Sequence, residues 1–204
     1  MIILDAGSGE TCGNDFAYVK KMIEAIPETD KKVVVKWQLF EDIPPLTPLA
    51  HDIYLYARDI AERRGFATAS SVFSQESLDF LLGTDPAFVK IACRPHLYPL
   101  IDKVPEDVEL VVSTGSHREW SQMKLKYHRA HVLCCVANYP AESKDYEDRF
   151  GGLLRYGISD HTEDWFLWNE HKPLVYEVHY RLEDSTGLDA LPFARTPEQL
   201  KEIL

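Results

Sequence analysis

The chain has 204 residues, of which 45% are hydrophobic and 27% are charged, and this is the composition of an ordinary folded domain rather than a disordered segment. Its length suits one domain with a core large enough to need no disulfide framework. The formal net charge of −11 argues against a nucleic-acid-binding or anionic-membrane surface, because both need clustered positive charge. One small basic pocket for an anion remains compatible with this balance.

The cysteines and the first residues predict a cytoplasmic protein. Cys12, Cys93, Cys134 and Cys135 form no C-x-x-C pair and no zinc-finger spacing, which favours a reducing compartment. Cys134 and Cys135 are adjacent, so we expect them on opposite faces of a strand, as core packing. Residues 1–5 lack the basic region of a signal peptide, and the longest apolar run, 132–137, is too short to span a bilayer.

Short β-rich runs alternate with longer amphipathic runs along the chain. We predict strands at residues 2–6, 33–40, 66–69, 88–93, 109–113, 131–137, 154–159 and 174–180. Several of these runs are almost continuously apolar, which is typical of parallel strands that are covered on both faces.

Helix signals occupy the gaps between these strands. We expect helix N-caps at Asp15, Thr47, Ser74, Asp160 and Thr196. A proline follows Thr47 at the first helical position, and Glu163 stands at the capping-box distance from Asp160. The helix after Ser74 is predicted over residues 75–82, the helix after Asp160 over 162–170, and the last helix ends at residue 204.

Eight successive β-then-α units predict an α/β fold, a compact (β/α)8 TIM barrel that forms one domain over residues 1–204. The later units are close to the shortest that can hold a strand, a helix and two turns. Three prolines leave little room for a helix in the fourth unit, and residues 41–47 are predicted to be a loop. An open doubly wound sheet is the main alternative, but no G-x-G-x-x-G follows any predicted strand.

Polar residues gather at the predicted C-terminal ends of the strands, where barrel enzymes carry their chemistry. Two lysines that point into a barrel are costly unless an anion meets them. Lys36 and Lys90, with Ser113 and Ser159, therefore predict a phosphate-sized site. His161 and His179 end neighbouring strands and are placed to share a divalent cation.

Each of these residues also has a purely structural explanation. A lysine at a strand end can reach water, His161 can belong to a helix-capping turn, and His179 can be a hydrogen-bonded core histidine. Trp165 and Trp168 are expected to pack. The remaining histidines are expected at the surface or in structural roles: His51, His96, His117, His128, His131 and His171.

Two runs resemble the catalytic signature of the sialic acid (N-acetylneuraminate) synthase family. They are G-I-S-D-H-T at residues 157–162 and E-V-H-Y at residues 177–180. Weaker similarities follow in order along nearly the whole chain: V-V-K-W-Q at 34–38, S-L-D-F-L at 77–81, V-K-I-A-C at 89–93, V-S-T-G at 112–115, Y-P at 139–140, G-L-D at 187–189 and T-P-E-Q-L at 196–200.

The resemblance implies an enzyme that condenses phosphoenolpyruvate with an N-acetylated amino sugar to form a nonulosonic acid. It implies that His161 and His179 hold a divalent metal, Mn2+ first, with Mg2+, Co2+ or Zn2+ as alternatives. Glu177 or Asp160 is expected to orient an imidazole. Asp5 takes the place of a family Glu beside the reacting sugar.

The remaining roles that the resemblance implies concern the two substrates. The phosphoenolpyruvate residues are Lys36, Lys90, Ser113 and Ser159. The residues expected on the sugar side are Gln38, Asn138, Tyr139 and Asp189. Cys93 stands where the family has a phosphoenolpyruvate-binding Ser, and the loop at residues 7–13 departs from the family pattern.

The family usually carries a C-terminal antifreeze-like domain that completes the sugar site of a partner subunit, and this chain has no counterpart. We therefore expect a homodimer or a separate antifreeze-like domain as a partner, with no nucleic acid and no membrane. Two alternatives to an active synthase stay open. One is an accessory barrel that binds metal and anion without turnover, and the other is a different metal-dependent barrel lyase, aldolase or sugar isomerase.

Overall fold

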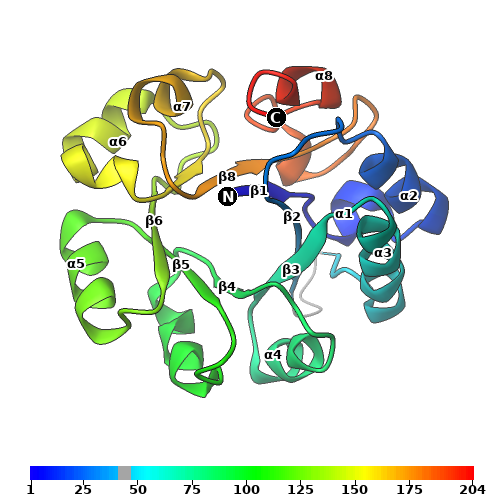
Figure 1. Ribbon diagram of the computed structural model, residues 1–204, viewed down its shortest axis with the longest axis horizontal. Helices are drawn as coiled ribbons and strands as arrows, with labels where there is room; N and C mark the ends of the chain where they lie inside the picture. Colours follow the sequence, from blue (N-terminus) through cyan, green and yellow to red (C-terminus); the bar gives the residue numbers. More distant parts are fainter. Residues whose placement is uncertain (41–46) are drawn as a thin grey trace.

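Eight parallel strands close into a barrel, and helices surround it (Figure 1). The computed structural model describes residues 1–40 and 47–204, so nearly all of the loop predicted at residues 41–47 lies outside the described residues. The strands are β1 (Ile2–Asp5), β2 (Val33–Leu39), β3 (Ala67–Val72), β4 (Val89–Ile91), β5 (Leu110–Thr114), β6 (His131–Cys135), β7 (Ile158–Asp160) and β8 (Tyr176–His179). Each strand pairs with the next, and β8 closes on β1. The predicted (β/α)8 barrel is confirmed.

Helical segments follow the strands in sequence. They are α1 (Gly9–Cys12), α2 (Phe16–Glu24), α3 (His51–Arg63), α4 (Gln75–Leu82), α5 (His117–Lys126), α6 (Ser143–Phe150), α7 (Phe166–His171) and α8 (Pro197–Leu200), with 3₁₀ helices over Pro95–Lys103, Gly151–Arg155 and Leu188–Ala190. The proline-rich fourth unit thus carries a 3₁₀ helix. None of the helices in the described ranges is long and apolar enough to cross a bilayer.

Three of the predicted N-caps are confirmed, and two are wrong. Asp15, Ser74 and Thr196 each accept a hydrogen bond from the first turn of their helix. Thr47 does not cap α3, which begins after Ala50. The Asn14 side chain accepts the Ala50 N–H at 3.0 Å instead, so a residue far away in sequence supplies this cap.

The second incorrect cap is Asp160, because α7 begins only at Phe166. The Asp160 carboxylate instead accepts hydrogen bonds from the Thr162 N–H and from the Tyr176 hydroxyl. It therefore ties the end of β7 to β8.

The predicted third and seventh strands and the last helix differ most from the structure, and β4, β6 and β8 are each shorter than predicted by two or three residues. The third strand runs to Val72 rather than Ala69, because Ser70 and Ser71 belong to it. The seventh begins at Ile158 rather than 154, because the apolar pair at 153–154 lies in the 3₁₀ helix that follows α6. The last helix ends at Leu200, and turns follow.

Side chains that point into the barrel form two layers. The apolar layer lies near the N-terminal ends of the strands and is made of Ile3, Val34, Ala69, Phe88, Val111, Leu133 and Val175. Residues of the opposite parity, such as Leu4, Val35 and Val112, pack outward in the core between the sheet and the helices. Two residues beyond each member of the apolar layer, the inward position is polar or a cysteine, and this second layer forms the candidate site.

Gly157 fills the eighth position of the apolar layer without a side chain. A Cβ built there would lie 2.5 Å from Leu133 Cδ2 and 3.3 Å from the Val132 carbonyl oxygen. Leu133 is fully buried and occupies this space. The glycine in the G-I-S-D-H-T run is therefore required by packing inside the barrel.

We expect Gly157→Ala to lower the free energy of unfolding by about 1–3 kcal/mol, because an added methyl group overpacks the apolar layer. Gly152→Ala is the matched control, since no heavy atom lies within 4 Å of a Cβ placed there. Urea denaturation of both variants measures the difference. Equal midpoints would contradict the packing argument.

Candidate active site

The second inward layer lines a cavity of about 370 Å³ in the barrel. This polar layer takes one residue from the end of each unit's strand: Asp5, Lys36, Ser71, Lys90, Ser113, Cys135, Ser159 and Glu177. All eight are buried. Gln38, Tyr139, His161, His179 and Asp189 line the same cavity. The alternation of a β-strand thus brings together residues that lie up to 172 positions apart in sequence.

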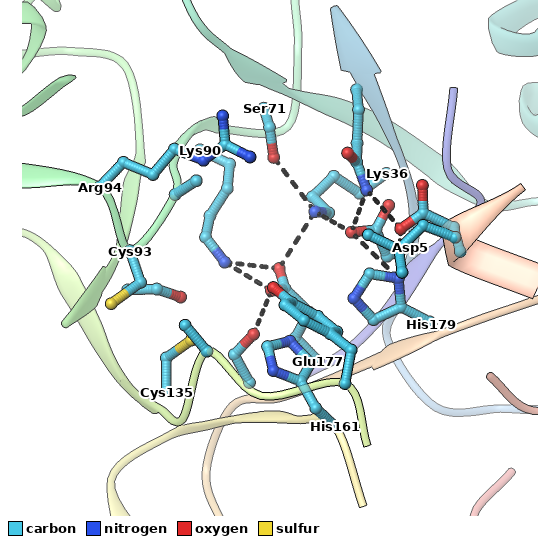
Figure 2. A pocket seen from close by; sticks show the side chains of 18 of the residues that line it. Asp5, Lys36, Ser71, Lys90, Cys93, Arg94, Cys135, His161, Glu177 and His179 are labelled. Carbon is cyan, nitrogen blue, oxygen red and sulfur yellow. Dashed lines mark hydrogen bonds and ion pairs between the residues drawn. The ribbon is translucent and has the colours of Figure 1, made fainter. Parts of the chain in front are cut away.

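Lys36 and Asp5 form the first buried ion pair of the polar layer (Figure 2). Lys36 Nζ lies 2.5 Å from Asp5 Oδ2 and donates to Ser71 Oγ at 3.1 Å. Gln38 donates to the same Asp5 oxygen at 3.0 Å. Burial alone would lower the pKa of Lys36, but the charges of Asp5 and Glu177 raise it above its ordinary value. Lys36 is therefore held in its charged form.

Lys90 and Glu177 form the second pair. Lys90 Nζ donates to both Glu177 oxygens, at 2.6 and 2.7 Å, and Ser159 Oγ donates to Oε1 at 2.7 Å. Lys36 Nζ lies 3.6 Å from Oε2, which joins the two pairs into one network. Burial would raise the pKa of Glu177, but the two lysines lower it well below its ordinary value. The lysines converge as predicted, and the charges that meet them here are carboxylates of the protein.

His161 and His179 lie side by side above this network, with ring centroids 5.2 Å apart. His161 Nδ1 lies 2.6 Å from the Val136 carbonyl oxygen. Because a carbonyl can only accept, Nδ1 carries the proton and Nε2 has the free lone pair. Burial and the neighbouring His179 lower the pKa of His161 to about 3, so its imidazole is neutral.

His179 has an acidic environment. Its Nδ1 lies 2.9 Å from Asp189 Oδ1 and 3.8 Å from Asp5 Oδ2. Burial would lower the pKa of His179, but these two carboxylates raise it above its ordinary value. Glu177 and Asp160 do not orient either imidazole, because Glu177 binds the lysines and Asp160 binds Tyr176.

The donor set at the two histidines fits a divalent cation. A ligating imidazole usually has its second nitrogen held by a carbonyl or a carboxylate. The Val136 carbonyl oxygen holds His161 Nδ1 in this way, whereas His179 Nδ1 lies 2.9 Å from Asp189 Oδ1 without the geometry of a hydrogen bond. Within the part of the chain that the structure describes, no group of three or more His, Cys, Asp or Glu side chains is arranged to hold a metal. His161 and His179 would therefore supply two ligands through their Nε2 atoms and leave other positions open.

Helix α6 fixes the backbone on which His161 stands. The buried Tyr146 hydroxyl donates to the Ser159 carbonyl oxygen at 2.7 Å and accepts the His161 N–H at 3.1 Å. One side chain from the outer layer thus holds two residues of the site at a set spacing.

Of the remaining predicted residues, some line the cavity and others do not. Tyr139 stacks on His161 with ring centroids 4.3 Å apart. Asn138 is exposed and does not line the cavity. The side chains continue to alternate after Cys135, so Ala137 and Tyr139 face the cavity and Asn138 faces away. None of the other six histidines lines the cavity, and the two tryptophans pack against the core as predicted.

Several cavity residues were not predicted from the sequence, and three of them carry polar or reactive side chains close to the predicted ones: Ser71, Cys135 and Arg94. Ser71 was missed because the third strand was predicted to end too early. Cys135 lines the cavity although it was predicted to be core packing; counting two residues on from Leu133 gives its inward direction. Arg94 also lines the cavity, and its guanidinium lies over the Phe73 ring at 5.4 Å. Nothing in the sequence distinguishes this single exposed arginine from any other arginine that follows a strand.

We expect Lys90→Met to destabilise the fold by about 3–5 kcal/mol, because it leaves part of the buried charge of Glu177 without its main partner. The lysine is almost fully buried, so water cannot take its place beside the carboxylate. Lys126→Met is the control, because its pair with Asp102 is exposed and should add little. Urea unfolding compares the two, and the double variant Lys90→Met, Glu177→Gln should recover part of the loss.

The fold and the site together define a class: a (β/α)8 barrel with a charged cavity at the C-terminal ends of its strands, where enzymes of this fold hold their active sites. The model of the NeuB family matches residues 46–203. The chain therefore belongs to the NeuB family, and the resemblance found in its motifs is confirmed.

Solved structures support the fold. An N-acetylneuraminic acid (sialic acid) synthetase from Leptospira borgpetersenii, in complex with citrate, is 18% identical with a TM-score of 0.77, and the match covers 99% of this chain and 80% of that chain. A spore coat polysaccharide biosynthesis protein E from Chromobacterium violaceum is 20% identical with a TM-score of 0.77, over 98% and 71%. A spore coat polysaccharide biosynthesis protein from Bacillus subtilis is 21% identical with a TM-score of 0.68, and the match covers 100% of this chain and 65% of that chain. No curated protein matches the chain.

Proposed function

We propose that this protein is a sialic acid synthase-like enzyme, which joins phosphoenolpyruvate to an N-acetylated amino sugar and forms a nonulosonic acid. The observation that carries the proposal is the polar layer, in which two buried lysines and three buried serines face the same cavity as a pair of histidines. Membership of the NeuB family and the likeness to a structure titled as a sialic acid synthetase support it.

The lysine side of the cavity suits the anionic substrate. Lys36 and Lys90 are charged donors for a phosphate or a carboxylate. Ser113 Oγ is buried and has no hydrogen-bond partner among the described residues, so an incoming oxygen would satisfy it. Asp5 and Glu177 neutralise the lysines before substrate arrives. The anion therefore exchanges with protein carboxylates for the same ammonium groups.

The histidine side suits the acceptor sugar. Gln38 and Asp189 are buried polar groups there, and the Gln38 amide joins Asp5 to Asp189. Carbon–carbon bond formation requires the enol carbon of phosphoenolpyruvate to attack the sugar aldehyde. Water then adds to the resulting cation, and phosphate leaves. A divalent cation held by His161 and His179 would supply Lewis-acid polarisation of the aldehyde.

The proposal is tested by a phosphate-release assay with phosphoenolpyruvate, Mn2+ and a panel of N-acetylated amino sugars. Acceptor-dependent release of phosphate, with a nonulosonic acid as product, is the expected result. Binding of phosphoenolpyruvate without release under any acceptor would favour an accessory barrel. Absence of binding by calorimetry would contradict the proposal at its anion site.

We expect Ser113→Ala to weaken phosphoenolpyruvate binding by about 10- to 100-fold, the worth of one hydrogen bond to a charged group. Its stability should hardly change, because Ser113 Oγ has no partner to lose among the described residues. Ser70→Ala is the reciprocal control. Ser70 Oγ donates to the Trp37 carbonyl oxygen at 2.9 Å and does not line the cavity.

The control variant should lose about 1 kcal/mol of stability and keep its affinity. Titration calorimetry measures the affinity of each variant for phosphoenolpyruvate, and urea unfolding measures the stability of each. If Ser113→Ala binds phosphoenolpyruvate as well as the parent protein does, the hydroxyl does not contact the anion.

A further inference from the structure

Two of the four cysteines share one wall of the cavity. Cys93 lies two residues beyond β4, and Cys135 is the last residue of β6. Both line the cavity, and Figure 2 shows their side chains next to each other on the side of Lys90. Cys12 and Cys134 are buried elsewhere, and Cys134 belongs to the outer core. The cavity therefore holds a thiol pair that the proposed reaction does not use.

Gly115 makes room for the Cys93 thiol. It follows β5, the strand that lies between β4 and β6. A Cβ built on Gly115 would lie 3.3 Å from Cys93 Sγ. The missing side chain lets the Cys93 sulfur lie against the backbone at this point, on the cavity side of β5.

The two thiols differ in acidity. The pKa of Cys93 lies below its ordinary value, first because the Cys135 thiol interacts with it, against the opposing effect of burial. Lys90 and Arg149 lower the pKa of Cys93 further, and Glu119 raises it. The Cys93 charge in turn raises the pKa of Tyr98. The pKa of Cys135 is raised well above its ordinary value by Cys93 and by burial. Cys93 is therefore the more acidic of the two thiols. It is also the more accessible one, because Cys12, Cys134 and Cys135 are all buried and Cys93 is not.

We infer that Cys93 is a modification site: hydrogen peroxide or a small thiophilic electrophile that enters the cavity reacts at its sulfur. With peroxide, the Cys93 thiolate attacks one oxygen, the S–O bond forms as the O–O bond breaks, and the hydroxide that leaves takes up a proton to become water. Sulfur loses two electrons and peroxide gains them, which leaves a sulfenic acid.

Modification of the Cys93 sulfur would block the part of the cavity that Lys90 and Ser113 line. This consequence rests on the proposed function, in which the anion binds there. Cys93 lines the same cavity as Lys90 and Ser113. An added oxygen or alkyl group on the sulfur occupies space that a phosphoenolpyruvate anion needs, and the reducing agent that removes a sulfenic oxygen restores it.

Labelling of the intact chain tests the assignment without any substrate. The reduced protein is treated with iodoacetamide at neutral pH, or with peroxide followed by dimedone, and the labelled peptides are identified by mass spectrometry. Cys93 should react at least about tenfold faster than the other three cysteines, because the thiolate is the reactive form. Cys135→Ala should slow labelling of Cys93 at neutral pH and leave it unchanged at alkaline pH. Faster labelling of another cysteine, or a Cys135→Ala variant that labels like the parent protein, overturns the inference.

Binding of phosphoenolpyruvate tests the consequence separately. Peroxide should abolish binding by the parent protein, and dithiothreitol should restore it. Cys93→Ser should bind with the same affinity before and after peroxide, whereas Cys12→Ser should stay sensitive. If the untreated protein does not bind phosphoenolpyruvate, the proposed function fails while the labelling result still decides the role of Cys93. Loss of binding in peroxide-treated Cys93→Ser contradicts the blocking mechanism.

Discussion

Four ionised side chains buried in one network determine how this barrel is organised. Asp5, Lys36, Lys90 and Glu177 are almost inaccessible to water, and each is tolerable only because the others neutralise it. Their positions must therefore be held closely. The apolar layer beneath them provides this support, because it anchors seven of the eight strand units at the neighbouring inward position. The packing of the apolar layer and the electrostatics of the polar layer therefore depend on each other.

The same network gives the cavity its chemical character. The chain carries an excess of negative charge overall, yet two lysines and an arginine line one cavity. An acidic surface slows the approach of an anion, so affinity must come from donors inside the cavity. Protein carboxylates already hold those donors. Under the proposed function, a bound anion would exchange with these carboxylates, and no ammonium group would be left unpaired.

The fold could be predicted because the alternation of inward and outward side chains repeats in every strand. Lys36 and Glu177 each lie two residues after a buried apolar residue, so their side chains also point into the barrel. The errors occurred where a contact comes from a distant segment. Thr47 is a good capping residue by type, but α3 starts after Ala50, and the side chain of Asn14 accepts the Ala50 N–H. Glu177 was expected beside an imidazole, and only the register across the barrel shows that it faces Lys90. Asn138 was misplaced by one residue, because Ala137 and Tyr139 are the positions after β6 that face the cavity.

Tyr146 shows how far control of the site extends beyond the cavity. Its hydroxyl joins the backbone at Ser159 and His161 from a helix on the outside of the barrel. A substitution on α6 that touches no ligand can therefore shift a histidine and a serine together. A change in helix α6 can in this way alter the geometry of the candidate active site while every residue that lines the cavity stays the same.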